Sequence, residues 1–156
     1  MDFNIDSIKE EFENFRNNCG SSCITQEENE VEDEQEESGF IGIVQKYLLA
    51  PNRCGVYLSR LDIKAIGLAF GEDVQVRERK RMIRDILKAV TSKEKLIKVF
   101  SIIKEAVDTK LDAYENIIKT FPKTKELFED KFKKAENFKK VLDKIVDDID
   151  EEVDFV

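Results

Sequence analysis

The chain has 156 residues, of which 38% are charged and 41% hydrophobic, and its formal net charge is −8. This length allows one domain, with or without a tail, and the composition is typical of a soluble, charge-rich helical protein. Histidine is absent, which excludes Ser-His-Asp, Cys-His and histidine-based metal chemistry within the chain. We therefore expect a protein that is not an enzyme and that needs no cofactor.

The chain has three cysteines, whereas a secreted disulfide framework would use an even number. Such a framework is therefore not expected. Cys19 and Cys23 form a C-x3-C spacing that could hold a metal or form a disulfide. Two or three thiolates without histidine make a poor zinc site unless a dimer completes it. We expect reduced thiols without a chemical role, and Cys19 and Cys23 are only weak metal candidates.

Neither the apolar runs of the sequence nor its first residues indicate a membrane protein. No apolar run approaches the roughly 20 residues that span a bilayer. The first residues, MDFNIDSIKEEF, are acidic and amphipathic, unlike a secretory signal or an Arg-rich transit peptide. We therefore expect a cytoplasmic protein with no membrane partner.

Residues 1–16 form a short amphipathic segment. Ile5, Ile8, Phe12 and Phe15 follow steps of three and four residues, which predicts that they share one helical face. A helix of about 14 residues is marginal by itself in water, so this face needs a partner. Three partners remain open: the chain's own bundle, a second copy of the segment, or another protein.

Residues 17–38 are predicted to be a disordered acidic linker. Eight acids and no base fall between residues 17 and 45, and Val31 is the one apolar residue in the run QEENEVEDEQEES. Such a segment buries too little apolar surface to offset its ordering entropy. In the simpler interpretation, this linker is a solvated spacer that keeps the protein soluble. The functional one is a nucleic-acid mimic or an autoinhibitory strap.

Residues 39–156 are predicted to form an all-α, antiparallel bundle of about five helices. The first helix covers residues 40–49 and ends before Pro51. The triplet 56–58 favours β-structure but is too short to imply a sheet. Ser59 then caps a helix that ends at Gly71. This helix is apolar nearly all round, so we expect it to be central and buried.

The eighty-five residues after Gly71 contain no glycine, and three more helices are predicted there. The first runs from about residue 73 to 90 and buries Val76. A capping box, Thr91 to Glu94, starts a long helix that ends near Thr120. Pro122 suits the first turn of the last helix, which lies antiparallel to the long one because their connection is short. The buried stripes are Leu96, Phe100, Ile103, Val107, Leu111, Tyr114, Ile118 and Phe121, then Phe128, Phe132, Ala135, Phe138, Leu142, Ile145 and Ile149.

A basic stripe is the clearest candidate for an anion-binding site. Arg77, Arg81, Arg84 and Lys88 follow steps of four, three and four residues, and such a stripe on a helix can neutralise phosphates. The preceding helix and Gly71 loosely imitate a helix-turn-helix. The alternative is a solvated face that is paired within the bundle or covered by the acidic linker.

Two functions from different classes follow from these features. The leading interpretation is a non-enzymatic protein-interaction module (an accessory, adaptor or chaperone-like protein). Its contact surfaces would be the N-terminal face with Phe12 and Phe15 and the exposed part of residues 40–49, and its partner another protein or a second copy. The alternative is a nucleic-acid-binding regulator that uses Arg77, Arg81 and Arg84 and is masked by the linker.

Overall fold

The computed structural model describes residues 39–150 and Phe155. Every element in this part of the chain is helical, which confirms the all-α prediction. Five helices have ten residues or more, in agreement with the expected number. The predicted N-terminal segment and acidic linker lie outside the described residues. The elements are α2 (Phe40–Leu49), α3 (Pro51–Cys54), α4 (Arg60–Phe70), α5 (Arg79–Lys88), α6 (Lys93–Thr120), the 3-10 turn η1 (Pro122–Thr124) and α7 (Lys125–Asp148).

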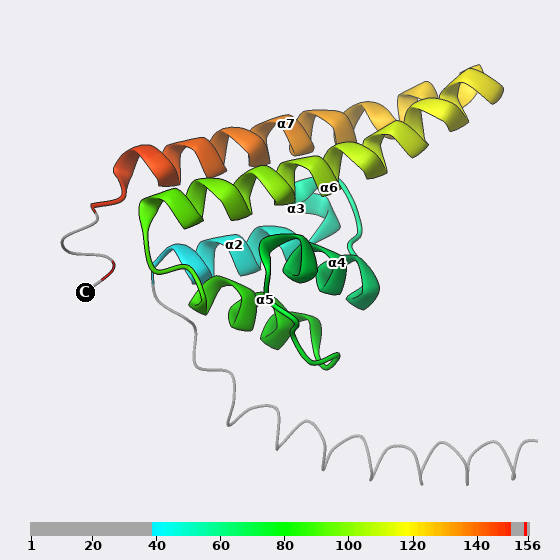
Figure 1. The fold of residues 1–156 in the computed structure, drawn as a ribbon. Helices are drawn as coiled ribbons and strands as arrows, with labels where there is room; N and C mark the ends of the chain where they lie inside the picture. Colours follow the sequence, from blue (N-terminus) through cyan, green and yellow to red (C-terminus); the bar gives the residue numbers. More distant parts are fainter. Residues whose placement is uncertain (1–38, 151–154, 156) are drawn as a thin grey trace, which may run out of the picture. The chain divides into compact units, whose positions relative to one another are not determined.

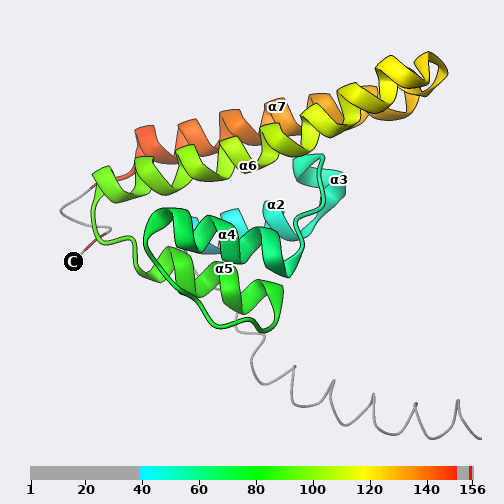
Figure 2. The same cartoon turned by 45° about the vertical axis from the view of Figure 1, so that its right-hand side comes forward.

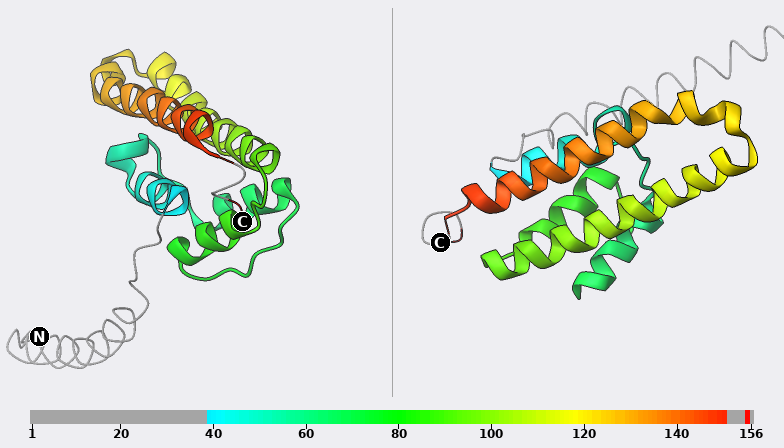
Figure 3. Two further views of the ribbon diagram at one scale, coloured as in Figure 1. Left: turned by 90° about the vertical axis from the view of Figure 1, so that its left-hand side faces the viewer. Right: turned by 90° about the horizontal axis from the view of Figure 1, so that it is seen from above.

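The described residues from Gly39 onward form two layers (Figures 1 and 2). One layer is the long hairpin of α6 and α7, which run antiparallel and side by side in every view, as Figure 3 also shows. The other layer contains α2, α3, α4 and α5. Two ion pairs, Lys104 with Asp143 and Lys139 with Asp108, join α6 to α7. The predicted antiparallel pairing of the last two helices is therefore confirmed.

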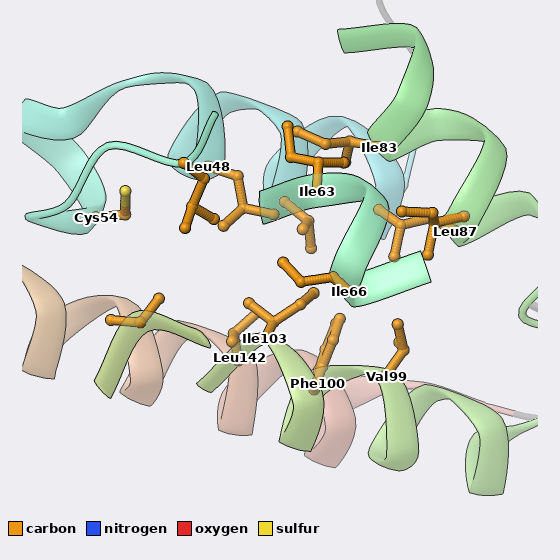
Figure 4. Close-up of a cluster of buried hydrophobic side chains, with 14 of the residues drawn as sticks. Leu48, Cys54, Ile63, Ile66, Ile83, Leu87, Val99, Phe100, Ile103 and Leu142 are labelled. Atoms are coloured by element: carbon orange, nitrogen blue, oxygen red, sulfur yellow. The ribbon is translucent and has the colours of Figure 1, made fainter. Parts of the chain in front are cut away.

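The hydrophobic core lies between the two layers. Figure 4 shows side chains of α2, α4 and α5 converging on those of α6 and α7. Phe100 of α6 is 2% exposed and Phe138 of α7 is fully buried. The Phe138 ring stacks on Tyr47 of α2 with 5.5 Å between ring centroids. The apolar spacing in the sequence thus fixes which face of each long helix points to the core.

The connection from α2 to α4 contains a close approach of two backbones. Pro51 begins α3, so the turn expected there is a single helical turn. Gly55 follows with a φ of 83°. A Cβ on Gly55 would lie 2.2 Å from the carbonyl oxygen of Lys131 in α7. Only glycine permits both this backbone conformation and this contact.

Helix α4 has the predicted bounds but not the predicted burial. Ser59 and Asp62 form the expected capping box, and Gly71 ends the helix in the left-handed region. The helix was expected to be buried nearly all round, and this was wrong, because Leu61 is 73% exposed and Leu68 is 53% exposed. Helices α5 and α6 pack on α4 from one side, so its opposite face has no covering element among the described residues.

The helix predicted to start near residue 73 begins six residues later, at Arg79. The segment before it is irregular and packs against α4. Val74 is 7% exposed, whereas Val76, the residue expected to be buried, is 48% exposed. The Lys64 ammonium donates hydrogen bonds to Asp73 and to the Val74 carbonyl. Burial of Val74 and these bonds hold the segment outside the helix.

The long helix α6 begins one residue later than predicted. Its cap is Ser92, whose hydroxyl oxygen accepts a hydrogen bond of 3.2 Å from the Lys95 amide. The predicted box between Thr91 and Glu94 is therefore wrong, because the cap lies one position further on. The helix ends at Thr120, as expected. Pro122 lies in a separate 3-10 turn, not in the first turn of α7.

The predicted stripe of α6 is buried only over its first part. Its apolar residues up to Leu111 lie in the core, but Tyr114 and Ile118 are half-buried and Phe121 is 62% exposed. The reason is length. Twenty-eight residues of α6 extend about 42 Å, and Figure 1 shows the end of α6 and the start of α7 projecting beyond the other layer.

Candidate interaction surfaces

A groove of about 470 Å³ lies between α4 and α6. Its walls are mainly small or apolar side chains, and its rim carries four polar or charged ones. An open, mostly apolar groove between two helices is a common shape for a binding site. The lining residues are Leu58, Asp62, Ala65, Ile66, Ala69, Ile102, Glu105, Ala106, Thr109, Lys110 and Ala113.

Alanines create the groove. Ala65 and Ala69 on α4 lie across from Ala106 and Ala113 on α6, and each lines the groove. A methyl group is too short to fill the space between two helices whose axes are held apart by the larger core side chains beneath. The space above the core therefore stays open to solvent.

The capping box of α4 also holds one end of the groove. The Ser59 amide and hydroxyl donate hydrogen bonds of 2.8 and 2.9 Å to the Asp62 carboxylate. The ammonium of Lys110 lies 3.0 Å from the same carboxylate and so ties α6 to α4. Burial opposes ionisation of Asp62, but the bonds from Ser59 and Lys110 outweigh it and lower the pKa of this carboxyl. The Asp62 carboxylate is therefore ionised at neutral pH.

The apolar surface extends past the groove on both helices. Leu61 and Leu68 are exposed on the outer side of α4, next to Ala65. On α6 the groove-lining face continues from Ala113 to Ile117, which is 40% exposed. From Ile102 to Ile117 this face of α6 is about 22 Å long, or four helical turns.

The predicted partner-binding residues are described only in part. Ile5, Ile8, Phe12 and Phe15 lie outside the described residues. The other predicted contact surface, the exposed part of α2, is small. Ile43 is 43% exposed, but Val44, Gln45 and Leu48 are buried. The Gln45 amide is used inside the protein, where it donates a 2.9 Å hydrogen bond to the Lys80 carbonyl of α5.

The basic stripe is largely engaged with acidic neighbours. Arg77 precedes α5, and its guanidinium pairs with Asp85. Arg81 lies 3.5 Å from Glu78, and Arg84 lies 3.8 Å from Asp85. These pairs reduce the positive charge that the stripe presents. The fourth residue, Lys88, is exposed and also has an interaction within the protein.

The sequence pattern did not single out Arg79, yet its guanidinium contacts both an aromatic ring and a backbone carbonyl. Its guanidinium lies 4.5 Å from the centroid of the Tyr57 ring and donates a long hydrogen bond of 3.5 Å to the Leu48 carbonyl. A cation over an aromatic face and a donor at a helix C-terminus are both stabilising. We assign Arg79 a structural role between α5 and the end of α2.

Cys54 has the surroundings of a structural thiol. It is fully buried, and its Sγ donates a 3.1 Å hydrogen bond to the Val56 carbonyl. Burial raises the pKa of this thiol, which disfavours the reactive thiolate. Cys19 and Cys23 lie outside the described residues. Within the described part of the chain no group of three potential metal-ligating side chains comes together.

The groove could have been anticipated only in part. The alanines on α6 recur in the sequence at spacings of seven residues, and those on α4 at four. This spacing places each set on one helical face, but it does not say which helix lies opposite.

The chain matches no family model, no curated protein and no solved structure. None of the helices in the described range is both long and apolar enough to cross a membrane.

Proposed function

We propose that this chain is a non-enzymatic protein-interaction module, of the adaptor, accessory or chaperone-like kind, that binds an amphipathic helix along the α4–α6 groove. The observation that carries the proposal is the groove of about 470 Å³ with the exposed Leu61 and Leu68 beside it. Large exposed apolar side chains beside an open apolar groove are more common at interaction sites than on the rest of a protein surface. A cytoplasmic location is part of the same proposal.

The shape of the groove suits a helix. Amphipathic helices bind in grooves through apolar anchors spaced by three and four residues. Alanines on both walls allow a third backbone to approach closely. The four-turn apolar face of α6 matches a partner helix of about 15 residues. Leu61 and Leu68 would cover the partner's outer edge.

Charged groups at the rim would orient the partner. The Asp62–Lys110 pair closes one end of the groove, and Glu105 lies on its wall. A basic residue of the partner near Glu105 would be favoured, and an acidic one would be repelled. The N-terminal face of Ile5, Ile8, Phe12 and Phe15 is a second contact surface in this proposal, for another protein or for a second copy.

The proposal is tested by crosslinking from within the groove. A photo-activated crosslinking side chain is placed at Ala69 of the full chain, in its native cell, and in a matched control at Asn137, which is exposed on α7 and does not line the α4–α6 groove. We expect an adduct from Ala69 but not from Asn137. Mass spectrometry should locate the adduct on an amphipathic helical segment of the partner. Adding Ala113→Glu should abolish it.

Two results would contradict the proposal. One is an adduct whose yield is equal from both positions and unaffected by Ala113→Glu. The other is a monomer by light scattering that forms no adduct and binds no apolar fluorescent dye. Circular dichroism of each variant shows whether the fold is intact, and because Ala69, Ala113 and Asn137 are all exposed, we expect that it is.

A further inference from the structure

A second surface lies at the end of the α6–α7 hairpin, and it adjoins the apolar face that continues from the α4–α6 groove at Ile117. We define the hairpin tip as residues 117–128, which include the end of α6, the turn η1 and the start of α7. Figures 1 and 2 show this end projecting beyond the helices of the other layer. Three large apolar side chains are exposed there: Ile117 is 40%, Phe121 62% and Leu127 71% exposed.

The hairpin itself offers these three side chains no room inside. Between the two helices, the space at this level is filled by the rings of Tyr114 and Phe128, which stack with 4.7 Å between centroids. Phe121 ends α6 just before Pro122, where the chain turns. Proline cannot continue the ladder of helical hydrogen bonds. The turn therefore leaves the Phe121 ring at the outer end of the hairpin.

The charges of the tip are mostly positive, with three lysines and one acid, Glu126. Lys119, Lys123 and Lys125 surround Phe121, and no acid occurs from Asn116 to Lys125. None of these three lysines forms an ion pair with another described residue. Two lysines of the hairpin body differ, because Lys104 and Lys139 each contact a carboxylate on the facing helix. The tip thus combines exposed apolar side chains with an excess of positive charge, because its three lysines outnumber its one acid.

We propose that the hairpin tip inserts into the surface of an anionic phospholipid bilayer. Phe121 and Leu127 enter the boundary between headgroups and acyl chains. The lysines keep their ammonium groups at the level of the phosphates while their methylene stems lie along the apolar region. Each lysine near an anionic surface strengthens binding about fivefold, and the effect falls with added salt.

Two other occupants fit the tip less well. A nucleic acid would account for the lysines but would leave Phe121 and Leu127 without a role. A protein partner contributes about 800 Å² per side in a standard interface, and a convex tip with three exposed apolar side chains provides little of that area. A fluid bilayer needs no complementary pocket. The expectation of no membrane partner came from the lack of a spanning run and the acidic N-terminal face, and neither concerns this tip.

The test is co-sedimentation of the full chain with two kinds of vesicle, one of phosphatidylcholine alone and one of phosphatidylcholine and phosphatidylserine in equal parts. The net charge of the chain is −8, so binding to the anionic vesicles needs a local positive site. We expect binding to the anionic vesicles and little to the neutral ones. Lys123→Gln should weaken it about fivefold, and Phe121→Ser with Leu127→Ser at least tenfold.

Matched controls change the same residue types elsewhere. Leu61→Ser with Leu68→Ser removes exposed apolar side chains from α4, and Lys140→Gln removes an exposed lysine from the body of α7. Both should leave vesicle binding unchanged, and circular dichroism should show that all variants are folded. The tip substitutions at Phe121, Lys123 and Leu127 change no residue that lines the α4–α6 groove, so their effect on vesicle binding is separate from the outcome of the crosslinking experiment.

Each of the following results would overturn the proposal. The first is no binding to anionic vesicles, or binding that falls equally with the α4 and tip substitutions. The second is binding to heparin that loses affinity with Lys123→Gln but not with Phe121→Ser, without vesicle binding, which would identify a polyanion as the occupant. The third is a dimer in light scattering that Phe121→Ser dissociates, again without vesicle binding, which would identify a second copy.

Discussion

The body and the tip of the α6–α7 hairpin have the same apolar spacing but opposite surroundings. In the body, Phe100 and Phe138 lie in the core and two lysines, Lys104 and Lys139, pair with carboxylates of the facing helix. At the tip, Phe121 and Leu127 are exposed and the lysines have no acidic partner among the described residues. The difference arises because α2 to α5 are too short to cover the full length of the hairpin. An apolar stripe therefore indicates a core only where a second layer is present to cover it.

The largest expected effect compares one phenylalanine from each region. Phe138→Ala should destabilise the protein by about 3–5 kcal/mol, because it removes a fully buried ring and leaves a cavity beside Tyr47. Phe121→Ala should cost less than about 0.5 kcal/mol, because its ring is already in contact with water. Urea denaturation followed by circular dichroism measures both. Similar losses for the two variants would show that the tip is as well packed as the body.

A second comparison uses two glycines with positive φ. Gly55→Ala should cost more than about 2 kcal/mol, because the strain of the left-handed conformation adds to a contact of 2.2 Å with the Lys131 carbonyl oxygen. Gly39→Ala should cost about 1–2 kcal/mol, because a φ of 74° with a ψ of −152° is a conformation that essentially only glycine adopts, but no atom lies within 4 Å of the added methyl group. Thermal unfolding of both variants gives the difference. Equal costs would mean that α7 does not rest on the backbone at Gly55.

A third expected effect concerns Asp62 at the end of the groove and depends on pH. Since the hydrogen bonds and Lys110 lower the pKa of Asp62 in the folded protein, its stabilisation is complete above the unfolded pKa of about 3.9 and is lost as the pH falls through the folded value. Asp62→Asn should cost about 1 kcal/mol at neutral pH. This cost should shrink as the pH is lowered below about 4. A cost that is independent of pH would exclude the ionised carboxylate as its source.

The smallest expected effects distinguish the lysines of the two regions. Lys139→Gln should cost about 0.5 kcal/mol at low salt, because it removes the ion pairs with Asp108 and Glu136. The cost should decrease when salt is added. Lys123→Gln should leave the free energy of unfolding unchanged within error at any salt concentration. Denaturation at two ionic strengths tests both, and a stabilising role for Lys123 would show that an acidic partner lies nearby.

Local signals predicted the ends of several helices. Pro51 and Gly71 mark ends that the structure confirms, and Ser59 starts α4 as expected. These signals act over three or four residues, so the sequence contains them in full. The helix predicted from residue 73 failed because its start depends on the distant contacts of Val74 and Lys64. The prediction of a cap at Thr91 was wrong by one residue, because the hydroxyl of the neighbouring Ser92 caps α6 instead.

The candidate surfaces were predicted less well than the helices. The groove exists because Ala69 and Ala113 belong to two helices that meet in space, and a sequence pattern describes one helix at a time. The basic stripe was predicted from its spacing, but Asp85, which pairs with Arg77, lies eight residues away across the irregular start of α5. Helical spacing alone does not reveal that contact.

By itself the sequence determined the helical class, most of the helix boundaries and the face of each long helix that turns inward, because propensity, capping and apolar spacing are local properties. Only the tertiary structure decided which apolar residues remain exposed. Leu61 and Phe121 are as apolar as Ile63 and Phe100, yet they stay exposed. The outer face of α4 has no covering helix among the described residues, and the second layer ends short of the hairpin tip. The surfaces proposed for binding are therefore a product of helix length and packing.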